Sequence, residues 1–246
     1  MLHHTYSFGA SVRGPLHRKE GRANEDAWLR AEGSFGTLVV VCDGMGSKPH
    51  ARTGSRAACA AVKEAVSRWS KADGAPVSYL SYLIEVLWRL RIHPMDPESA
   101  ATTCLLALAT AKGTWVVGGV GDGLVLARSD SKLQVLIGDR GDGFSNETIG
   151  LGASNGPRAW TLTELPPSEG ERITVLATDG VADDLLPEHL NGFCDWLIDT
   201  FVHLTPKERW RTLAAELRDW PTPGHLDDKT LAVVHTPAPA SRRQYE

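Results

Sequence analysis

Acidic residues stand at the ends of several short apolar segments of this chain. They occur at five places: Asn24-Glu25-Asp26-Ala27, Asp43-Gly44, Asp122, Asp179-Gly180 and Asp227-Asp228. Any one of these sites alone would indicate a turn, because Asp-Gly is a common turn-forming pair. Together they indicate a cation site, since Mg²⁺ and Mn²⁺ take oxygen ligands and are often held by only a few carboxylates.

The residues of other hydrolytic sites are not spaced for catalysis. The histidines lack the spacing of a zinc protease, and Ser47 has no G-x-S-x-G surroundings. The cysteines stand singly within apolar runs, which predicts buried free thiols at Cys42, Cys59, Cys104 and Cys194. A metal-activated water is therefore the nucleophile that the sequence favours.

Short runs rich in β-branched residues predict the strands that must position these acids. The predicted strands are residues 28–31, 35–42, 102–110, 114–120, 123–129, 132–138, 172–178 and 229–236. We expect residues 35–42 to be buried on both faces, because the run is almost continuously apolar. Turn residues at 112–113, 121–122 and 129–131 join consecutive strands so tightly that we expect these neighbours to be antiparallel.

Helical periodicity appears between the strands. It predicts helices over residues 53–69, 78–92, 188–201 and 206–220, the last opening with a capping box at Thr205 and Glu208. We expect the first two to form a hairpin on the face of a sheet. Residues 139–170 predict a long surface excursion, and residues 237–246 predict a disordered tail. This order of elements predicts antiparallel sheets with helices packed outside.

Length, composition and charge limit the classes of protein that fit. The chain has 246 residues, 42% of them hydrophobic, which predicts a single domain over residues 1–236. Its formal net charge of −4 lacks the basic excess of a nucleic-acid binder. The first ten residues lack the pattern of a secretory signal, and no stretch approaches about 18 apolar residues. We expect a cytoplasmic monomer with no nucleic-acid or membrane partner.

Six segments occur in an order found in one enzyme family. They are Gly14-x-x-His17 through Asn24-Glu25-Asp26-Ala27, Val41-Cys42-Asp43-Gly44-Met45-Gly46-Ser47, Ala101-Thr102-Thr103, Gly121-Asp122-Gly123, Ala177-Thr178-Asp179-Gly180-Val181 and Asp227-Asp228-Lys229-Thr230-Leu231. In these motifs the sequence resembles metal-dependent serine/threonine phosphatases of the type 2C (PPM) family, most of all the bacterial branch. The resemblance implies an α+β fold, a four-layer αββα sandwich of two antiparallel sheets flanked by helices. It also implies a centre with two Mn²⁺ or Mg²⁺ ions at one edge.

The resemblance further implies a role for the acids of that centre. Asp43 would bridge both metals, and the Gly44 carbonyl would bind one of them. Asp26 would act mainly through water on one side, and Asp179 and Asp227 would hold the other metal. These assignments follow the position of each residue within its motif.

Two further acids and the reaction are implied in the same way. Glu25 would support the metal ligands without touching the metals, and Asp122 would help to hold a third, weaker metal. The implied reaction is hydrolysis of phosphoserine or phosphothreonine by attack of a metal-bridging hydroxide, without a phosphoenzyme intermediate. The substrate would be a phosphoprotein produced by a cognate kinase.

The phosphate-binding arginine departs from the family pattern. It commonly stands five positions before the first-motif aspartate, but here that position is Gly21, and Arg22 lies one residue closer. Arg22 is our candidate for substrate binding and catalysis. The alternatives for gripping the phosphate are Arg13, Arg18 and Lys48.

The proton donor to the leaving group is a second departure. Met45 stands where many eukaryotic relatives carry a histidine proposed for this role. His17 or His50 could serve instead, although an ordinary surface histidine is the simpler interpretation of each.

Two rival functions stay open at this point. One is a catalytically silent module of the same family that binds phosphoprotein or metal; the intact acids at positions 26, 43, 179 and 227 argue against it. The other is a metal-dependent phosphodiesterase or nuclease, which the acidic charge balance disfavours.

Overall fold

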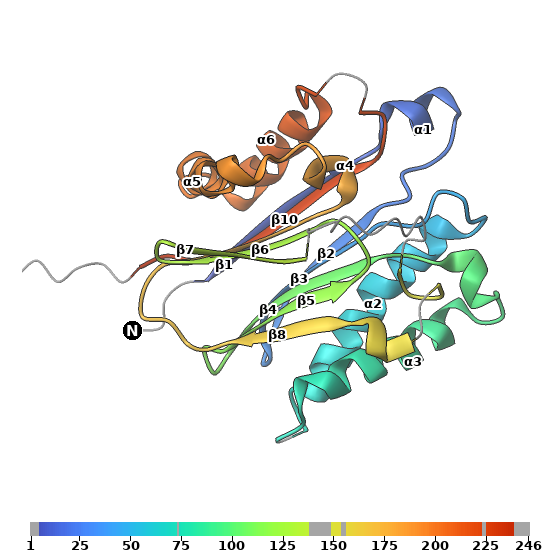
Figure 1. Cartoon of the computed structure of the whole chain (residues 1–246), viewed down its shortest axis with the longest axis horizontal. Coiled ribbons are helices and arrows are strands. Elements are labelled where there is room, and N and C mark those ends of the chain that lie inside the picture. The colour runs from blue at the N-terminus through green and yellow to red at the C-terminus, as the bar shows by residue number, and fades with distance from the viewer. Residues whose placement is uncertain (1–4, 73, 138–148, 154–155, 223–224, 239–246) are drawn as a thin grey trace, which may run out of the picture.

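Two antiparallel sheets pack face to face and helices cover both outer faces (Figure 1). The structure, a computed structural model, describes residues 5–72, 74–137, 149–153, 156–222 and 225–238. One sheet has the order β1 (Tyr6–Val12), β10 (Lys229–Thr236), β9 (Arg172–Ala177), β6 (Leu124–Ser129) and β7 (Lys132–Ile137). The other has the order β2 (Ala27–Gly33), β3 (Gly36–Cys42), β4 (Cys104–Thr110), β5 (Trp115–Val120) and β8 (Thr161–Leu165). The predicted α+β sandwich of four layers is confirmed.

The two helical layers belong to different sheets. Helices α2 (Ala51–Trp69) and α3 (Val77–Ile92) form the expected hairpin on the sheet that contains β3. Helices α5 (Leu190–Phe201) and α6 (Pro206–Arg218) cover the sheet that contains β1. The shorter elements are α1 (Pro15–Lys19), α4 (Asp179–Ala182) and the 3₁₀ turns η1 (Pro97–Ala100), η2 (Gly156–Ala159) and η3 (Pro187–His189). None of the described helices has the length and apolar character needed to cross a membrane.

Strand β3 is buried on both faces, as its composition predicts. Leu38, Val40 and Cys42 face the layer of α2 and α3, whereas Val39 and Val41 face the second sheet. Complete burial of one aliphatic side chain contributes about 1.5–3 kcal/mol, so this strand is firmly fixed. All four cysteines are also buried and free, as predicted.

The connection between β5 and β6 differs from its prediction. The two strands lie in different sheets, so residues 121–122 do not join antiparallel neighbours. Gly121 and Gly123 both have a φ of +105°, which only glycine adopts readily, and a Cβ on Gly121 would lie 2.7 Å from the Thr103 side chain. The chain therefore crosses from one sheet to the other at this corner. The tight joints at residues 112–113 and 129–131 do connect antiparallel pairs.

Two strands were not predicted, and each lies at the edge of a sheet. β1 pairs only with β10, and β8, which falls inside the predicted surface excursion of residues 139–170, pairs only with β5. In β1 the core residues Tyr6, Phe8, Ala10 and Val12 alternate with small residues, a pattern that sequence reasoning missed, whereas β8 is a short strand with only two apolar residues, Leu162 and Leu165. Residues 139–148 and 154–155 of the excursion, residue 138 at the end of the predicted strand 132–138, and residues 239–246 of the predicted tail lie outside the described residues.

Candidate metal centre

The strand register brings the acidic sites to one edge of the sandwich. Ala27 pairs with Cys42, so β2 begins beside the end of β3. Ala177 pairs with Leu124 and with Leu231, so β9 ends between the starts of β6 and β10. The acids that flank these strand ends are Asp26, Asp43, Asp122, Asp179 and Asp227. A cavity of about 950 Å³ opens at this edge, and all of these acids except Asp26 line it.

Backbone contacts fix Asp43 at the end of β3. Its N–H donates to Thr103 Oγ1 at 2.9 Å, and its carbonyl accepts from Thr102 Oγ1 at 2.8 Å and from the Thr103 N–H at 2.8 Å. A Cβ on Gly44 would lie 2.5 Å from the Ala51 carbonyl oxygen, so this close turn admits only glycine. The motif Ala101-Thr102-Thr103 thus holds the aspartate that the sequence analysis placed at the centre of the site.

Asp26 lies behind the cavity wall and is 5% exposed. Its Oδ2 accepts hydrogen bonds from Thr230 Oγ1 at 2.6 Å and from Thr178 Oγ1 at 3.0 Å. Burial raises its pKa to about 8, and the charge of Asp228 adds to this, while the hydroxyl of Thr230 acts in the opposite direction. Both threonines belong to the motifs quoted above, although sequence reasoning assigned no role to either.

The carboxylates of the cavity oppose one another's ionisation. Burial raises the pKa of Asp43 well above its ordinary value, and the charges of Asp26, Asp179 and Asp227 raise it further. Burial also raises the pKa of Asp179, followed by the charges of Asp227 and Asp122. A nearby cation would reverse this effect, because it favours the charged form of each acid.

The donor set suits a hard divalent cation, since it consists of carboxylate oxygens with the Gly44 carbonyl beside them. The charges of Asp26 and Asp179 act on the carboxylate of Asp43, so the three acids lie close together. Across the described residues, no three side chains of His, Cys, Asp or Glu are already disposed so that they could hold a metal ion. The acids are thus adjacent and chemically suitable, and a bound cation would relieve the repulsion between their charges.

Asp228 organises the segment that leads into the site, a role that sequence reasoning missed. It is 2% exposed, and its Oδ1 accepts from the Gly14 N–H at 2.7 Å. Its Oδ2 accepts from the Glu25 N–H at 2.7 Å and lies 2.9 Å from His17 Nδ1. An ionised carboxylate only accepts, so His17 donates through Nδ1. The signal was present in the Asp227-Asp228 pair, of which only the first member had been assigned a role.

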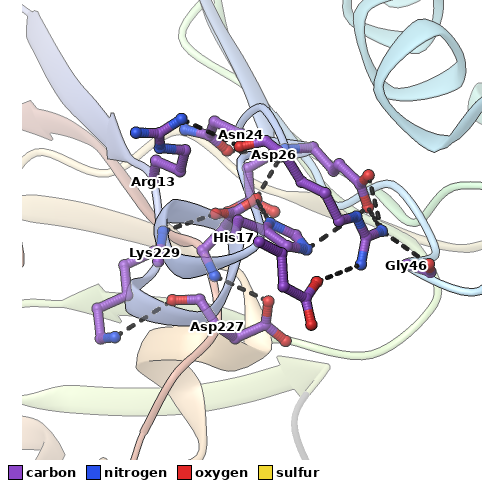
Figure 2. Close-up of polar contacts among 12 residues, drawn as sticks. Arg13, His17, Asn24, Asp26, Gly46, Asp227 and Lys229 are labelled. Carbon is purple, nitrogen blue, oxygen red and sulfur yellow. Dashed lines mark hydrogen bonds and ion pairs between the residues drawn. The ribbon is translucent and has the colours of Figure 1, made fainter.

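Arg22 lines the cavity and is held there by two groups. Its Nη2 donates to both carboxylate oxygens of Glu25 at 2.9 Å and to the Gly46 carbonyl at 2.9 Å (Figure 2). Within the described part of the chain, its Nη1 reaches only Glu20 Oε2, at 3.5 Å. Glu25 therefore positions the guanidinium at the cavity while the rest of its donors stay accessible.

The alternative phosphate-binding residues separate into two groups. Lys48 lines the same cavity as Arg22, and its Nζ lies 2.8 Å from Glu98 Oε1. Arg13 and Arg18 line a different, smaller pocket. The structure therefore leaves Arg22 and Lys48 as the arginine and lysine side chains of the described residues that border the cavity.

The two histidines named as possible proton donors have different positions. His17 lines the cavity and is 6% exposed, so the interpretation of it as a surface histidine is wrong. Its burial follows from the contact with Asp228, which lies 211 positions away in the sequence. His50 is exposed at the start of α2 and does not line the cavity. Met45 lines it.

Comparisons with known proteins give the same family as the motifs. A family model described as protein phosphatase 2C matches residues 13–220. No curated protein matches the sequence. Among solved structures, the PPM Ser-Thr phosphatase MsPP from Mycobacterium smegmatis, in complex with cacodylate, is 19% identical, with 93% of this chain and 97% of that chain covered and a TM-score of 0.62.

Two other solved structures are similar over nearly their whole length. The catalytic domain of the serine/threonine protein phosphatase PstP, in complex with two manganese ions, is 19% identical, covers 95% of this chain and 98% of that chain, and has a TM-score of 0.62. The serine/threonine phosphatase of S. agalactiae is 17% identical, covers 94% and 99%, and has a TM-score of 0.64. At these identities the structures show the shared fold, and the family model shows the family. The chain belongs to the protein phosphatase 2C family.

Proposed function

We propose that this protein is a phosphatase that depends on divalent cations and hydrolyses phosphoserine and phosphothreonine in proteins. The observation that carries the proposal is one cavity that is lined both by the acids Asp43, Asp179 and Asp227 and by Arg22. Cations held among the acids and the arginine beside them would together bind a phosphate dianion.

The acidic residues of the cavity would have different roles in metal binding. Asp43, the Gly44 carbonyl, Asp179 and Asp227 would hold two Mn²⁺ or Mg²⁺ ions, with Asp26 acting from behind through water. Asp122, which lines the cavity at the β5–β6 corner, would contribute to a third, weaker site. Bound cations would supply activation of water and neutralisation of the phosphoryl oxygens.

Arg22 would bind the phosphate of the substrate. Glu25 and the Gly46 carbonyl fix its Nη2, so the side chain would lose little conformational entropy when its remaining N–H groups bind the phosphate. Asp228 accepts from the Glu25 N–H and contacts His17 Nδ1, so it holds the Glu25 backbone in place and thereby positions the arginine. This coupling would give Glu25 a positioning role toward Arg22, beside the support of the metal ligands that the family resemblance implied.

The test is hydrolysis of p-nitrophenyl phosphate and of a phosphothreonine peptide, in EDTA and then with excess Mn²⁺ or Mg²⁺. We expect activity only with metal, and we expect Asp43→Asn to abolish it. Asp199→Asn is the matched control, because Asp199 is an exposed aspartate on α5, far along the chain from the acidic motifs.

The rival function gives a different result in the same experiment. A silent regulatory module would bind Mn²⁺, detected by calorimetry, and would hydrolyse neither substrate. Full activity in excess EDTA would overturn the metal-dependent mechanism.

A further inference from the structure

A second, smaller pocket lies next to the catalytic cavity. Its volume is about 190 Å³, and four basic residues line it: Arg13, Arg18, Arg218 and Lys229. No aspartate or glutamate is among the described residues that line it. The volume is below the roughly 300 Å³ at which pockets for drug-sized ligands begin, so it suits a single side chain.

The positive charge of this pocket is only partly balanced. No described residue forms an ion pair with any of the four basic side chains. Lys229 is 5% exposed, and its Nζ is 3.3 Å from the backbone carbonyl oxygen of His225 and 3.3 Å from that of Asp227. Lys229 and Asp227 are labelled in Figure 2. The positive charge of Arg18 also acts on it.

The acids closest to Lys229 are already engaged by other groups. Asp184, Asp227 and Asp228 act on its charge from outside the pocket lining. Asp184 Oδ2 accepts from Trp220 Nε1 at 2.9 Å and lies 2.8 Å from His225 Nδ1. Asp228 accepts the three hydrogen bonds described above. An anion entering the pocket would therefore meet basic side chains that have no carboxylate partner there.

The wall between the pocket and the catalytic cavity is short and apolar. His225 and Leu226 line both spaces, and Leu16 lines the catalytic cavity. The Leu16 N–H donates to the Leu226 carbonyl at 3.1 Å, and both leucine side chains are exposed, at 39% and 47%. One residue of α1, His17, faces the catalytic cavity, and the next, Arg18, lines the basic pocket. A peptide bound in the cavity can thus continue across these leucines.

We propose that this basic pocket binds an anionic side chain of the substrate, a carboxylate or a second phosphate, that lies near the phosphoresidue in the sequence. This inference rests on the proposed function and adds the substrate class: phosphoproteins in which the phosphoresidue has acidic or phosphorylated neighbours. The pocket supplies specificity for the substrate, and the acidic cavity supplies the chemistry.

The test compares matched phosphothreonine peptides whose flanking residues are glutamate, phosphoserine or glutamine. We expect kcat/KM for the glutamate and phosphoserine peptides to exceed that for the glutamine peptide about tenfold at low salt, and the ratio to fall as salt is added. In the double variant Arg18→Gln/Arg218→Gln the ratio should fall close to one. Hydrolysis of p-nitrophenyl phosphate should stay within about twofold of wild type. The control is Arg211→Gln, an exposed arginine of α6 outside the pocket.

Each outcome of the peptide assay either supports or overturns the pocket proposal. The preference is a ratio measured within one protein, so partial unfolding of a variant cancels from it. A wild-type ratio near one, or a tenfold ratio that survives the double substitution, overturns the pocket proposal. A preference for only one of the two anionic peptides identifies which group the pocket takes.

Failure of the proposed function is a separate result. If the protein hydrolyses neither p-nitrophenyl phosphate nor the phosphopeptides in the presence of Mn²⁺, the phosphatase proposal is overturned. The pocket is then tested by fluorescence anisotropy with the labelled glutamate peptide. Weaker binding by the double variant than by Arg211→Gln supports the pocket even in that case, and equal binding overturns it.

Discussion

Replacement of Asp228 tests how the site is held in place. Asp228→Ala removes the acceptor of the Gly14 and Glu25 N–H groups and of His17 Nδ1. Because Asp228 is 2% exposed, water replaces these contacts poorly. The segment between Gly14 and Glu25 would lose its attachment to the start of β10.

The expected cost follows from these three contacts. At about 1.5–3 kcal/mol for each hydrogen bond to a charged group, the upper bound is about 9 kcal/mol. Rearrangement of the exposed α1 segment lowers the cost below this upper bound. Loss of one partner of a buried ion pair typically costs about 3–5 kcal/mol, and we expect Asp228→Ala to fall in this range. For a chain of this size that corresponds to a fall in Tm of about 6–20 °C. Asp228→Asn keeps one acceptor oxygen and should lose about half as much.

The assay is urea or thermal unfolding in EDTA, so that bound metal adds nothing to the stability of any variant. The neighbouring Asp227→Asn is the control. Asp227 is exposed in the cavity, and its charge raises the pKa values of Asp43 and Asp179, so its removal should leave the metal-free midpoint unchanged or higher while weakening Mn²⁺ binding. An Asp228→Ala protein that unfolds at the wild-type urea concentration would refute the reasoning.

The other predictions concern the site itself. Asp43→Asn and Asp179→Asn should each lower kcat more than about 100-fold, equal to about 2.7 kcal/mol, with a native circular dichroism spectrum; a loss below tenfold would show that the assignment is wrong. Arg22→Ala and Arg22→Lys should both lower kcat/KM for phosphopeptides about 10- to 100-fold with unchanged metal affinity; the lysine variant is included because lysine lacks the planar fork of arginine. Wild-type kinetics of both variants would indicate that Lys48 binds the phosphate instead. The folded-state pKa of Asp26 is about 8, above the ordinary value of 3.8, so the folded metal-free protein binds the extra proton and its stability should decrease as pH rises from about 4 to about 8. A Tm in EDTA that rises across this range would contradict that sign, and calorimetry in buffers of different ionisation enthalpy should show that Mn²⁺ binding releases protons.

The sequence by itself determined the strands and helices that have strong local patterns. Strand β3 lies between two apolar layers, so its residues must be almost continuously apolar, and that run is visible without any knowledge of the fold. The aspartates at strand ends were visible for the same reason, because each interrupts such a run. The capping box of Thr205 and Glu208 marked the start of α6, since its hydrogen bonds join residues three positions apart.

Only the tertiary structure decided how distant segments meet. Gly121 and Asp122 look like a hairpin turn, yet the connection that they form joins two sheets, because the choice of partner depends on packing with β8 and β9. The edge strands β1 and β8 are defined by single partners elsewhere in the chain.

The same holds for the polar residues around the site. Asp228 and His17 are 211 positions apart, and Thr178 and Asp26 are 152 apart, so no local spacing reveals these hydrogen bonds. Arg18 and Arg22 are only four positions apart, yet the path of the chain after α1 places them at different pockets. The type of each residue can be read from the sequence, whereas its burial and its partners depend on contacts between segments far apart in the sequence. These contacts bring the separate acids and arginines together into a site.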